Sequence, residues 1–181
     1  MDFFQDGSKW GVEIRYIHEK SAMGTAGALG ILDEQPQQSF IVMNGDVLTN
    51  VNYQQLLDFH QEHSSQATMC VREYDFHIPY GVVKIENHKL CGIEEKPIQT
   101  VFVNAGIYVF EPQIINLIPK NIPFDMPDLF KMALDQKLNN VVFPIREYWL
   151  DVGQMNDFEQ ANVDYERIFS LKGNCLKEEL T

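Results

Sequence analysis

Apolar residues along the chain follow the spacings that distinguish strands from helices. Residues 40–43, Phe-Ile-Val-Met, form a short uninterrupted apolar run, which is typical of a buried strand. Residues 53–63 place Tyr53, Leu56, Leu57 and His60 on one stripe at helical spacing, which predicts a helix. Residues 11–17 instead alternate between apolar and charged positions, which favours a strand with one solvated face.

The remaining pattern alternates strands with helices and then becomes rich in strands. Asn87-His88 separates two short apolar runs and predicts a hairpin turn. This order indicates a layered α/β domain with a mixed sheet, and we expect a single domain over residues 1–181. The other predicted strands span residues 67–71, 82–85, 89–93, 101–110 and 141–145, and the other helices span residues 25–32, 113–117, 127–136 and 156–171.

Composition limits the partners that the chain can bind. Hydrophobic residues make up 45% of the 181 positions, which is enough for one substantial core. The formal net charge of −12 argues against a nucleic-acid backbone or an anionic membrane surface as a partner. Phosphates can still bind such a chain where a few cations, amides or metal ions are concentrated locally.

Cysteine content and hydropathy indicate a reducing compartment. Cys70, Cys91 and Cys175 are widely spaced and odd in number, which favours buried or isolated thiols over a disulfide framework or a zinc site. No apolar stretch approaches the length of a membrane span, and the first residues lack the character of a signal peptide. We therefore expect a cytoplasmic protein.

The most informative segment for chemistry is Asn44-Gly45-Asp46, which follows the predicted strand at residues 40–43. Ligands of open α/β sheets gather at the carboxyl ends of strands, and a carboxylate there can hold Mg²⁺ against a phosphate. An ordinary Asn-Gly-Asp turn is the alternative. Asp151 also lies close to a glycine after an apolar stretch, and it could complete a metal site with Asp46 or simply precede a helix.

Two further segments could bind phosphates. Gly24 and Thr25 open a helix of small residues, where free N–H groups and the helix dipole would face a ligand, although tight packing against the sheet explains them equally well. Glu95 and Lys96 end the predicted hairpin, where an ammonium can bind a phosphate and a carboxylate can accept hydrogen bonds from sugar hydroxyls. A solvated run of charges is the alternative for this pair.

Other polar residues in apolar surroundings suggest a sugar pocket. Tyr80 and Gly81 start a strand where the aromatic ring could line a pocket, or could pack in the core. Asn104, two residues before Gly106, places an amide in an apolar strand, where a polyhydroxyl ligand or neighbouring backbone could satisfy it. The histidines show no metal-ligand spacing, and we expect His60 and His63 to be surface residues.

Taken in order, these segments resemble the sugar-1-phosphate nucleotidyltransferase family. The resemblance covers about residues 6–162, and the Gly-Thr-Ala-Gly form is most similar to the mannose-1-phosphate and heptose-1-phosphate guanylyltransferases. The ordered segments are Gly24-Thr25-Ala26-Gly27, Asn44-Gly45-Asp46, Tyr80-Gly81-Val82-Val83, Glu94-Glu95-Lys96-Pro97, Val103-Asn104-Ala105-Gly106-Ile107-Tyr108 and Trp149-Leu150-Asp151-Val152-Gly153.

The resemblance implies a Rossmann-like mixed sheet and transfer of a nucleoside monophosphate, GMP from GTP by preference, to a sugar 1-phosphate. It implies the following roles. Asp46 and Asp151 hold the catalytic Mg²⁺, and Lys96 binds the sugar phosphate. Glu95 and Asn104 form hydrogen bonds with sugar hydroxyls. The residues that border the sugar are Tyr80, Gly81 and Gly106, and those beside the nucleotide are Gly24, Thr25, Asn44 and Gly45.

One departure from the family pattern bears on activity. The glycine-rich loop G-x-G-T-R-L-x-P-L-T, which grips the β- and γ-phosphates in that family, has no match in residues 1–181. By the family topology, the first two strands of the sheet also have no match here, and they would lie in the sheet between the strands predicted at residues 11–17 and 40–43. We therefore expect an N-terminally incomplete domain with little activity by itself, in which the gap favours self-association. A non-catalytic module that binds sugar phosphate or nucleotide is the alternative function.

Overall fold

A four-stranded mixed sheet organises residues 3–169, the part of the chain that the computed structural model describes. The strand order is β1 (Phe40–Met43), β6 (Ile98–Phe110), β3 (Ala67–His77) and β7 (Asn140–Ile145). Strand β6 runs antiparallel to β1 and β3, whereas β7 runs parallel to β3. The α/β class and the mixed sheet predicted from the sequence are therefore confirmed.

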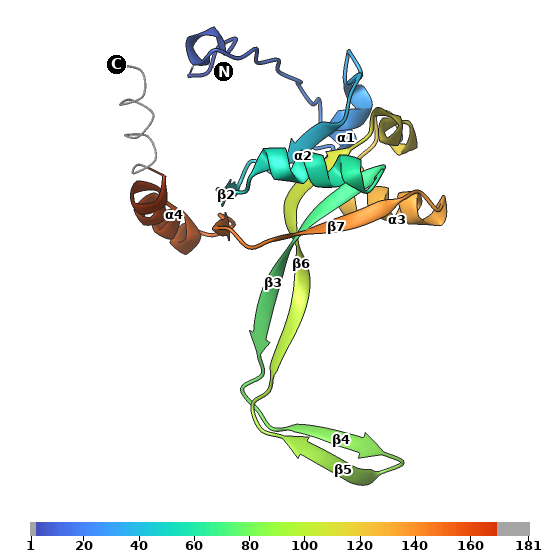
Figure 1. Cartoon of the computed structure of the whole chain (residues 1–181), viewed down its shortest axis with the longest axis vertical. Helices are drawn as coiled ribbons and strands as arrows, with labels where there is room; N and C mark the ends of the chain where they lie inside the picture. The colour runs from blue at the N-terminus through green and yellow to red at the C-terminus, as the bar shows by residue number, and fades with distance from the viewer. Residues whose placement is uncertain (1–2, 170–181) are drawn as a thin grey trace.

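Helices pack around the body of this sheet, and two small ladders lie apart from it, one of them at the far end of the extended strands β3 and β6 (Figure 1). The ladders pair β2 with β8 and β4 with β5, both in antiparallel fashion. The helices are α1 (Gly24–Gly27), α2 (Tyr53–Glu62), α3 (Met126–Asp135) and α4 (Met155–Ile168), the 3-10 turns are η1 (Ser8–Trp10), η2 (Ala28–Ile31) and η3 (Pro112–Leu117), and the ladder strands are β2 (Val47–Thr49), β4 (Val82–Glu86), β5 (Lys89–Glu94) and β8 (Trp149–Asp151).

The C-terminal half of β6 is buried on both faces of the sheet. Successive side chains of a strand point to opposite faces, so neighbouring residues enter different cores. Tyr108 and Phe110 join the buried cluster formed with α1, η3 and α3. Ile107 and Val109 join a second cluster that includes Leu56 of α2. The central strand thus links two hydrophobic cores, one on each side of the sheet.

Strands β3 and β6 continue beyond these cores as a long two-stranded arm (Figure 1). Their pairing extends to His77 opposite Ile98, and the β4–β5 hairpin lies at the far end. The predicted turn is confirmed, because Asn87 and His88 both adopt positive φ angles of 46° and 66°, as two-residue hairpin turns of type I′ require. The arm is solvated on both faces, unlike the body of the sheet.

The strand predicted at residues 11–17 is wrong. No regular structure is present there, and no strand pairs with this segment in the described part of the chain. Val12 and Tyr16, two of the three apolar residues of the alternation, are 55% and 41% exposed, so this apolar face does not cover a core. Alternation alone does not make a strand, because the backbone also needs a neighbouring strand with which to exchange hydrogen bonds.

Three other predictions from the pattern need correction. Strand β1 is only half-buried, because it lies at the edge of the sheet. His60 is completely buried rather than at the surface, since it belongs to the same helical stripe as Leu56. The helix predicted over residues 25–32 is divided into the single turn α1 and the 3-10 turn η2.

The remaining helices and strands lie where the sequence places them, with shifted ends. Helix α4 begins one residue early and ends at Ile168, and the predicted residues 170 and 171 lie outside the described residues, as does Cys175. Cys70 and Cys91 are free thiols, the first buried and the second exposed. Burial raises the pKa of the Cys70 thiol to about 12, so it behaves as a small apolar core residue.

Replacement of Leu56 tests the core beside α2. Leu56 is completely buried, so Leu56→Ala should lower the free energy of unfolding by about 3 kcal/mol in urea titrations, through lost burial and the cavity left behind. The matched control is Leu90→Ala on the hairpin, where the side chain is 63% exposed and the change should stay within about 0.5 kcal/mol. Equal losses for the two variants would contradict this description of the core.

Candidate functional site

A turn at the end of β1 brings two aspartates from distant segments together. The Asn44 N–H donates to the Gly106 carbonyl at 2.8 Å, which fixes the turn against β6. After the turn, β2 pairs with β8 so that Val47 lies opposite Asp151. The Val152 N–H then donates to the Asp46 carbonyl at 2.8 Å. Asp46 and Asp151 are therefore neighbours at one end of this small ladder.

Electrostatics at this pair favour a bound cation. The pKa of Asp151 is raised, first by partial burial and then by the negative charges of Asp46 and Asp157. Carboxylates that repel one another in this way gain from an oxygen-seeking divalent ion, and Mg²⁺ commonly takes only one or two protein carboxylates. The pair fits such an ion, although residues 3–169 contain no group of three or more His, Cys, Asp or Glu side chains arranged to hold a metal.

Asn104 and Gly106 lie beside the same turn. Gly106 has a φ of 70°, and a Cβ there would lie 2.9 Å from Asn44 Nδ2, so the close approach of the turn requires glycine. Asn104 is exposed rather than buried, and its neighbours engage the amide. Its Oδ1 accepts from the Gly106 N–H at 3.0 Å, and its Nδ2 donates to the Tyr108 hydroxyl at 2.7 Å. The turn thus gathers Asn44, Gly45, Asp46, Asn104, Gly106 and Asp151.

A second group of the predicted residues lies at the base of the distal hairpin. A Cβ on Gly81 would lie 3.0 Å from Glu95 Oε2, so the two segments that flank the hairpin are in contact. Tyr80 is 74% exposed, which excludes a place in the core. Lys96, also exposed, follows Glu95 directly with a φ of 46°. Tyr80, Gly81, Glu95 and Lys96 therefore form one accessible cluster.

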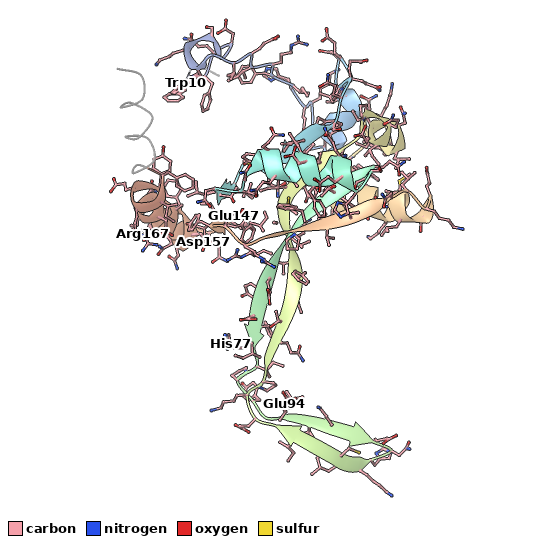
Figure 2. All side chains as sticks on the ribbon, viewed as in Figure 1. Trp10, His77, Glu94, Glu147, Asp157 and Arg167 are labelled. Atoms are coloured by element: carbon pink, nitrogen blue, oxygen red, sulfur yellow. The ribbon has the colours of Figure 1, made fainter. Side chains whose placement is uncertain are left out.

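The structure does not bring this hairpin cluster to the aspartate pair. Ile98 and Asn104 are separated along β6 by about 20 Å at the usual rise of a strand. Figure 2 shows the same separation, with Glu94 at the far end of the arm, His77 along it, and Asp157 beside the body of the molecule. The predicted site is thus divided between the body and the arm.

Gly24 and Thr25 are occupied by contacts within the chain. The Thr25 N–H donates to Asp125 Oδ1 at 3.0 Å, and the Met126 N–H donates to the Thr25 hydroxyl at 2.8 Å. The next two amides of α1 donate to the Phe124 carbonyl. The expectation of free N–H groups is therefore wrong here, because the start of α3 caps the short helix. Tight packing, the alternative that the sequence allowed, describes this segment.

Several residues that position the aspartates carry no motif of their own. Trp149 Nε1–H donates to the Ala105 carbonyl at 2.8 Å and holds β8 against β6. Arg72 donates to the carbonyls of Ile145 and Glu147 at 3.1 and 2.9 Å, which fixes the segment leading to β8. The only sequence signal for Arg72 is a lone cation after an apolar run. These contacts fix the segment between β7 and β8, and so the position of Asp151.

A groove opens beside Asp46. It has a volume of about 380 Å³ and lies between the β1–β2 turn and α4. Helix α4 contributes Phe158 and Tyr165, both 55% exposed, as well as Asn162. A ligand bound here would contact an aspartate at one end and aromatic side chains along its length.

Residues 2–168 match the family described as Nucleotidyl transferase, and the chain belongs to that family. The aspartate pair and the hairpin cluster both lie within the matched region. The fold agrees with this assignment. A Bacillus anthracis protein named as a glucose-1-phosphate thymidylyltransferase superposes on this chain with a TM-score of 0.68 and 23% sequence identity, and the match covers 90% of this chain and 69% of that protein.

Similar sequences include enzymes with different nucleotide names. The catalytic subunit beta of mannose-1-phosphate guanylyltransferase from Dictyostelium discoideum is 34% identical over 157 residues, which are 83% of this chain and 43% of that protein. The UTP–glucose-1-phosphate uridylyltransferase of Synechocystis is 31% identical over 179 residues, which are 88% of this chain and 46% of that protein. The chain spans about half the length of the curated relatives that it matches.

Hydropathy adds one observation about the helices. Within residues 3–169, none of the helices is both long and apolar enough to cross a membrane.

Replacement of Gly24 tests the packed start of α1. Gly24 has a φ of 75°, and a Cβ there would lie 2.6 Å from Asp125 Oδ1 and 2.7 Å from the Phe124 carbonyl oxygen. Gly24→Ala should therefore lower the free energy of unfolding by at least about 1–2 kcal/mol, the cost of a left-handed alanine alone. Gly45→Ala is the control, since nothing lies within 4 Å of a Cβ at that position. A neutral Gly24→Ala variant would contradict the close approach of Asp125.

Replacement of Asp151 tests the repulsion between carboxylates. Because the folded-state pKa of Asp151 is raised, the folded protein binds the proton more tightly than the unfolded chain does. The wild type should therefore gain stability relative to Asp151→Asn as the pH falls from 7 towards 4, and the variant should be the more stable at pH 7 without metal. Urea titrations across this range measure the difference, with Asp33→Asn as an exposed control. A variant that is less stable at pH 7 would contradict the repulsion.

Proposed function

We propose that the chain is the nucleotidyl-transfer part of a sugar-1-phosphate guanylyltransferase, with GTP and mannose 1-phosphate as the preferred substrates. The observation that carries this proposal is the proximity of Asp46 and Asp151, which follows from the pairing of Val47 with Asp151 and from the hydrogen bond between Val152 and Asp46, within a chain of the nucleotidyl transferase family. The guanylyltransferase names of several relatives support guanine over other bases. The uridylyltransferase relative makes base choice the part most in need of an experiment.

The proposed reaction is an in-line attack by a phosphate oxygen of the sugar 1-phosphate on the α-phosphorus of GTP. A phosphorus–oxygen bond forms as pyrophosphate leaves, and no general base is needed, because a phosphate monoester with a second pKa of about 6 is largely dianionic at pH 7. Mg²⁺, when held by Asp46 and Asp151, supplies charge neutralisation at the reacting phosphates.

The other residues of the proposed site bind and orient the substrates. Lys96 binds the phosphate of the sugar 1-phosphate, and the neighbouring Glu95 accepts hydrogen bonds from sugar hydroxyls. Asn104, which lies at the aspartate turn, bonds sugar hydroxyls from that side of the ligand. Tyr80 and Gly81 border the sugar. This assignment requires the arm to carry the hairpin cluster towards Asp46, since the two groups are separated in the structure. Positioning of this kind accounts for much of the rate in reactions that need no covalent intermediate.

We also propose that this chain by itself is a slow catalyst in the cytoplasm. Loss of one transition-state cation in other phosphoryl-transfer enzymes costs on the order of 10³–10⁵ in rate, and residues 1–181 offer no match to the glycine-rich loop of the family. The free thiols of Cys70 and Cys91 agree with a reducing compartment. Free edges of the sheet make a homo-oligomer a reasonable assembly.

A non-catalytic binding module is the second candidate. The separation of Lys96 from Asp46 favours it, because a module that only binds sugar phosphate needs the hairpin cluster and no aspartate pair. The two candidates differ in their response to nucleotide and metal, which calorimetry can measure directly.

Calorimetric titration of GTP in the presence of Mg²⁺ distinguishes the two functions. We expect nucleotide binding that requires the metal and falls at least about tenfold in Asp46→Asn and in Asp151→Asn, because each variant removes one charged ligand. Asp33→Asn is the matched control and should bind as the wild type does. Binding of GTP that is indifferent to Mg²⁺ and to both variants would leave the binding module as the better description.

Replacement of Lys96 tests the hairpin cluster. Lys96→Ala should weaken the binding of mannose 1-phosphate about tenfold or more through loss of a charge-assisted hydrogen bond, while Lys89→Ala on the same hairpin should have little effect. Isothermal titration of each variant gives the comparison. Equal weakening by both substitutions would indicate general attraction of anions instead of a site at Lys96.

A further inference from the structure

A second groove lies at the opposite end of β1 from the aspartate turn. It is an open groove of about 740 Å³, lined by the end of α2, the loop before β3, the η3 turn after β6, and the end of α3 with the loop that follows. Ser39, just before β1, reaches Glu111 in this groove, whereas Asp46 follows the other end of the strand. The groove is therefore a separate site.

Glu111 is the only Asp, Glu, Lys or Arg residue that lines the groove, and one of its two carboxylate oxygens is held by contacts within the chain. The Ser39 hydroxyl donates to Oε1, and His60 Nε2 lies 3.3 Å from the same atom. His60 is completely buried and also contacts the Thr68 hydroxyl through Nδ1 at 2.7 Å. Burial lowers the pKa of His60, which favours its neutral form. Among the described residues no hydrogen bond involves Oε2, so this oxygen remains available as an acceptor in the groove.

Other polar groups in the groove also lack partners. The Ser65 hydroxyl is buried, with the residue 4% exposed, and its Oγ has no hydrogen-bond partner in the structure. No hydrogen bond among residues 3–169 involves the side-chain amides of Gln113, Asn116 or Gln136. Gln66 is oriented by the Asn139 N–H, which donates to Oε1 at 2.7 Å and leaves the NH₂ group free. Each amide group supplies two donors and an acceptor.

The lining determines which chemical class can satisfy these groups. No lysine or arginine lines the groove, so a phosphate or carboxylate would meet Glu111 without a compensating cation. An ammonium group could pair with Glu111, but it only donates hydrogen bonds and therefore could not accept from the amide NH₂ groups of the lining. A hydroxyl both donates and accepts. Ile114, Leu117 and Leu138 add an apolar surface that suits the C–H face of a ring.

We propose that this groove is a second ligand site, which binds a small uncharged polyhydroxylated molecule such as a free sugar or a cyclitol. Glu111 Oε2 accepts from a ligand hydroxyl, and the amides of Gln113, Asn116 and Gln136 bind further hydroxyls around the ring. His60, Thr68 and Ser39 are positioning residues, because they hold Glu111 without reaching the ligand. The site is independent of the proposed transfer reaction.

Nuclear magnetic resonance titration of the ¹⁵N-labelled chain tests this site. The probes are methyl α-D-glucopyranoside and myo-inositol, with glucose 6-phosphate as the anionic comparison and putrescine as the cationic one. We expect both uncharged probes to shift the side-chain NH₂ signals of Gln113, Asn116 and Gln136 in a saturable manner. Asn116→Leu and, separately, Gln113→Leu should each weaken binding about tenfold, while Asp46→Asn should leave it unchanged.

Several outcomes would overturn the proposal. One is a response of these amides to putrescine or glucose 6-phosphate that equals or exceeds the response to the uncharged probes. Another is a shift confined to residues around Asp46 and Asp151. A third is the absence of any saturable shift in the wild type. Amide spectra of the two leucine variants serve as the folding control, and the exposed positions of Gln113 and Asn116 make both variants compatible with the fold.

Discussion

The backbone of residues 104–106 in β6 is the point on which the candidate site depends. The Gly106 carbonyl accepts from Asn44, and the Ala105 carbonyl accepts from the Trp149 indole. These two bonds attach the segments that carry Asp46 and Asp151 to the same short stretch of the central strand. Because β6 is buried on both faces at its C-terminal half, this stretch is held by two cores at once. The positions of Asp46 and Asp151 are therefore fixed by their hydrogen-bonded attachment to β6, a strand that is buried on both faces in its C-terminal half.

The same strand explains why the molecule has a rigid part and an extended part. Towards Phe110, β6 lies between helices, and its side chains are completely buried. Towards Ile98, it pairs only with β3, and Phe102 and Ile98 are 64% and 55% exposed. Two-stranded ribbons gain little stability from their own pairing. The hairpin cluster with Lys96 is thus attached to a solvated two-stranded ribbon and not to the packed body of the molecule.

The sequence predicted the parts of the fold that have a strong hydrophobic period. Residues 53–63, 101–110 and 141–145 became α2, β6 and β7 with small shifts in their ends. The β2–β8 ladder was missed, because its three-residue strands are too short to show any period. The opposite error occurred at residues 11–17, where a clear alternation is present and a pairing strand is absent from the described residues. The hydrophobic period of one segment does not show whether another strand is present to pair with it.

The candidate site could be predicted from residue types only in part. The aspartates were found because each follows an apolar run beside a glycine, and the structure places them together. Thr25 shows the limit of such reasoning. The sequence cannot indicate that the Thr25 N–H donates a hydrogen bond to Asp125, which is one hundred residues away. His60 shows the same limit, because only the fold reveals that Thr68 and Glu111 satisfy a buried imidazole. Long-range hydrogen bonds decide whether a polar motif faces a ligand or the protein.

Charge balance connects these observations to the proposed reaction. A chain with a net charge of −12 repels a nucleoside triphosphate at long range, and the aspartate pair adds negative charge where the phosphates would react. The aspartate pair can bind a triphosphate favourably only if a divalent cation lies between the carboxylates and the phosphates. Binding of the metal and binding of the nucleotide should therefore depend on each other. Burial first, and then the negative charges of Asp46 and Asp157, raise the pKa of Asp151, and a bound cation would offset this cost of the ionised carboxylate. The groove at Glu111 also has no lysine or arginine in its lining, but its amide groups both donate and accept hydrogen bonds, so the ligand proposed for it is uncharged and differs in chemistry from a nucleoside triphosphate.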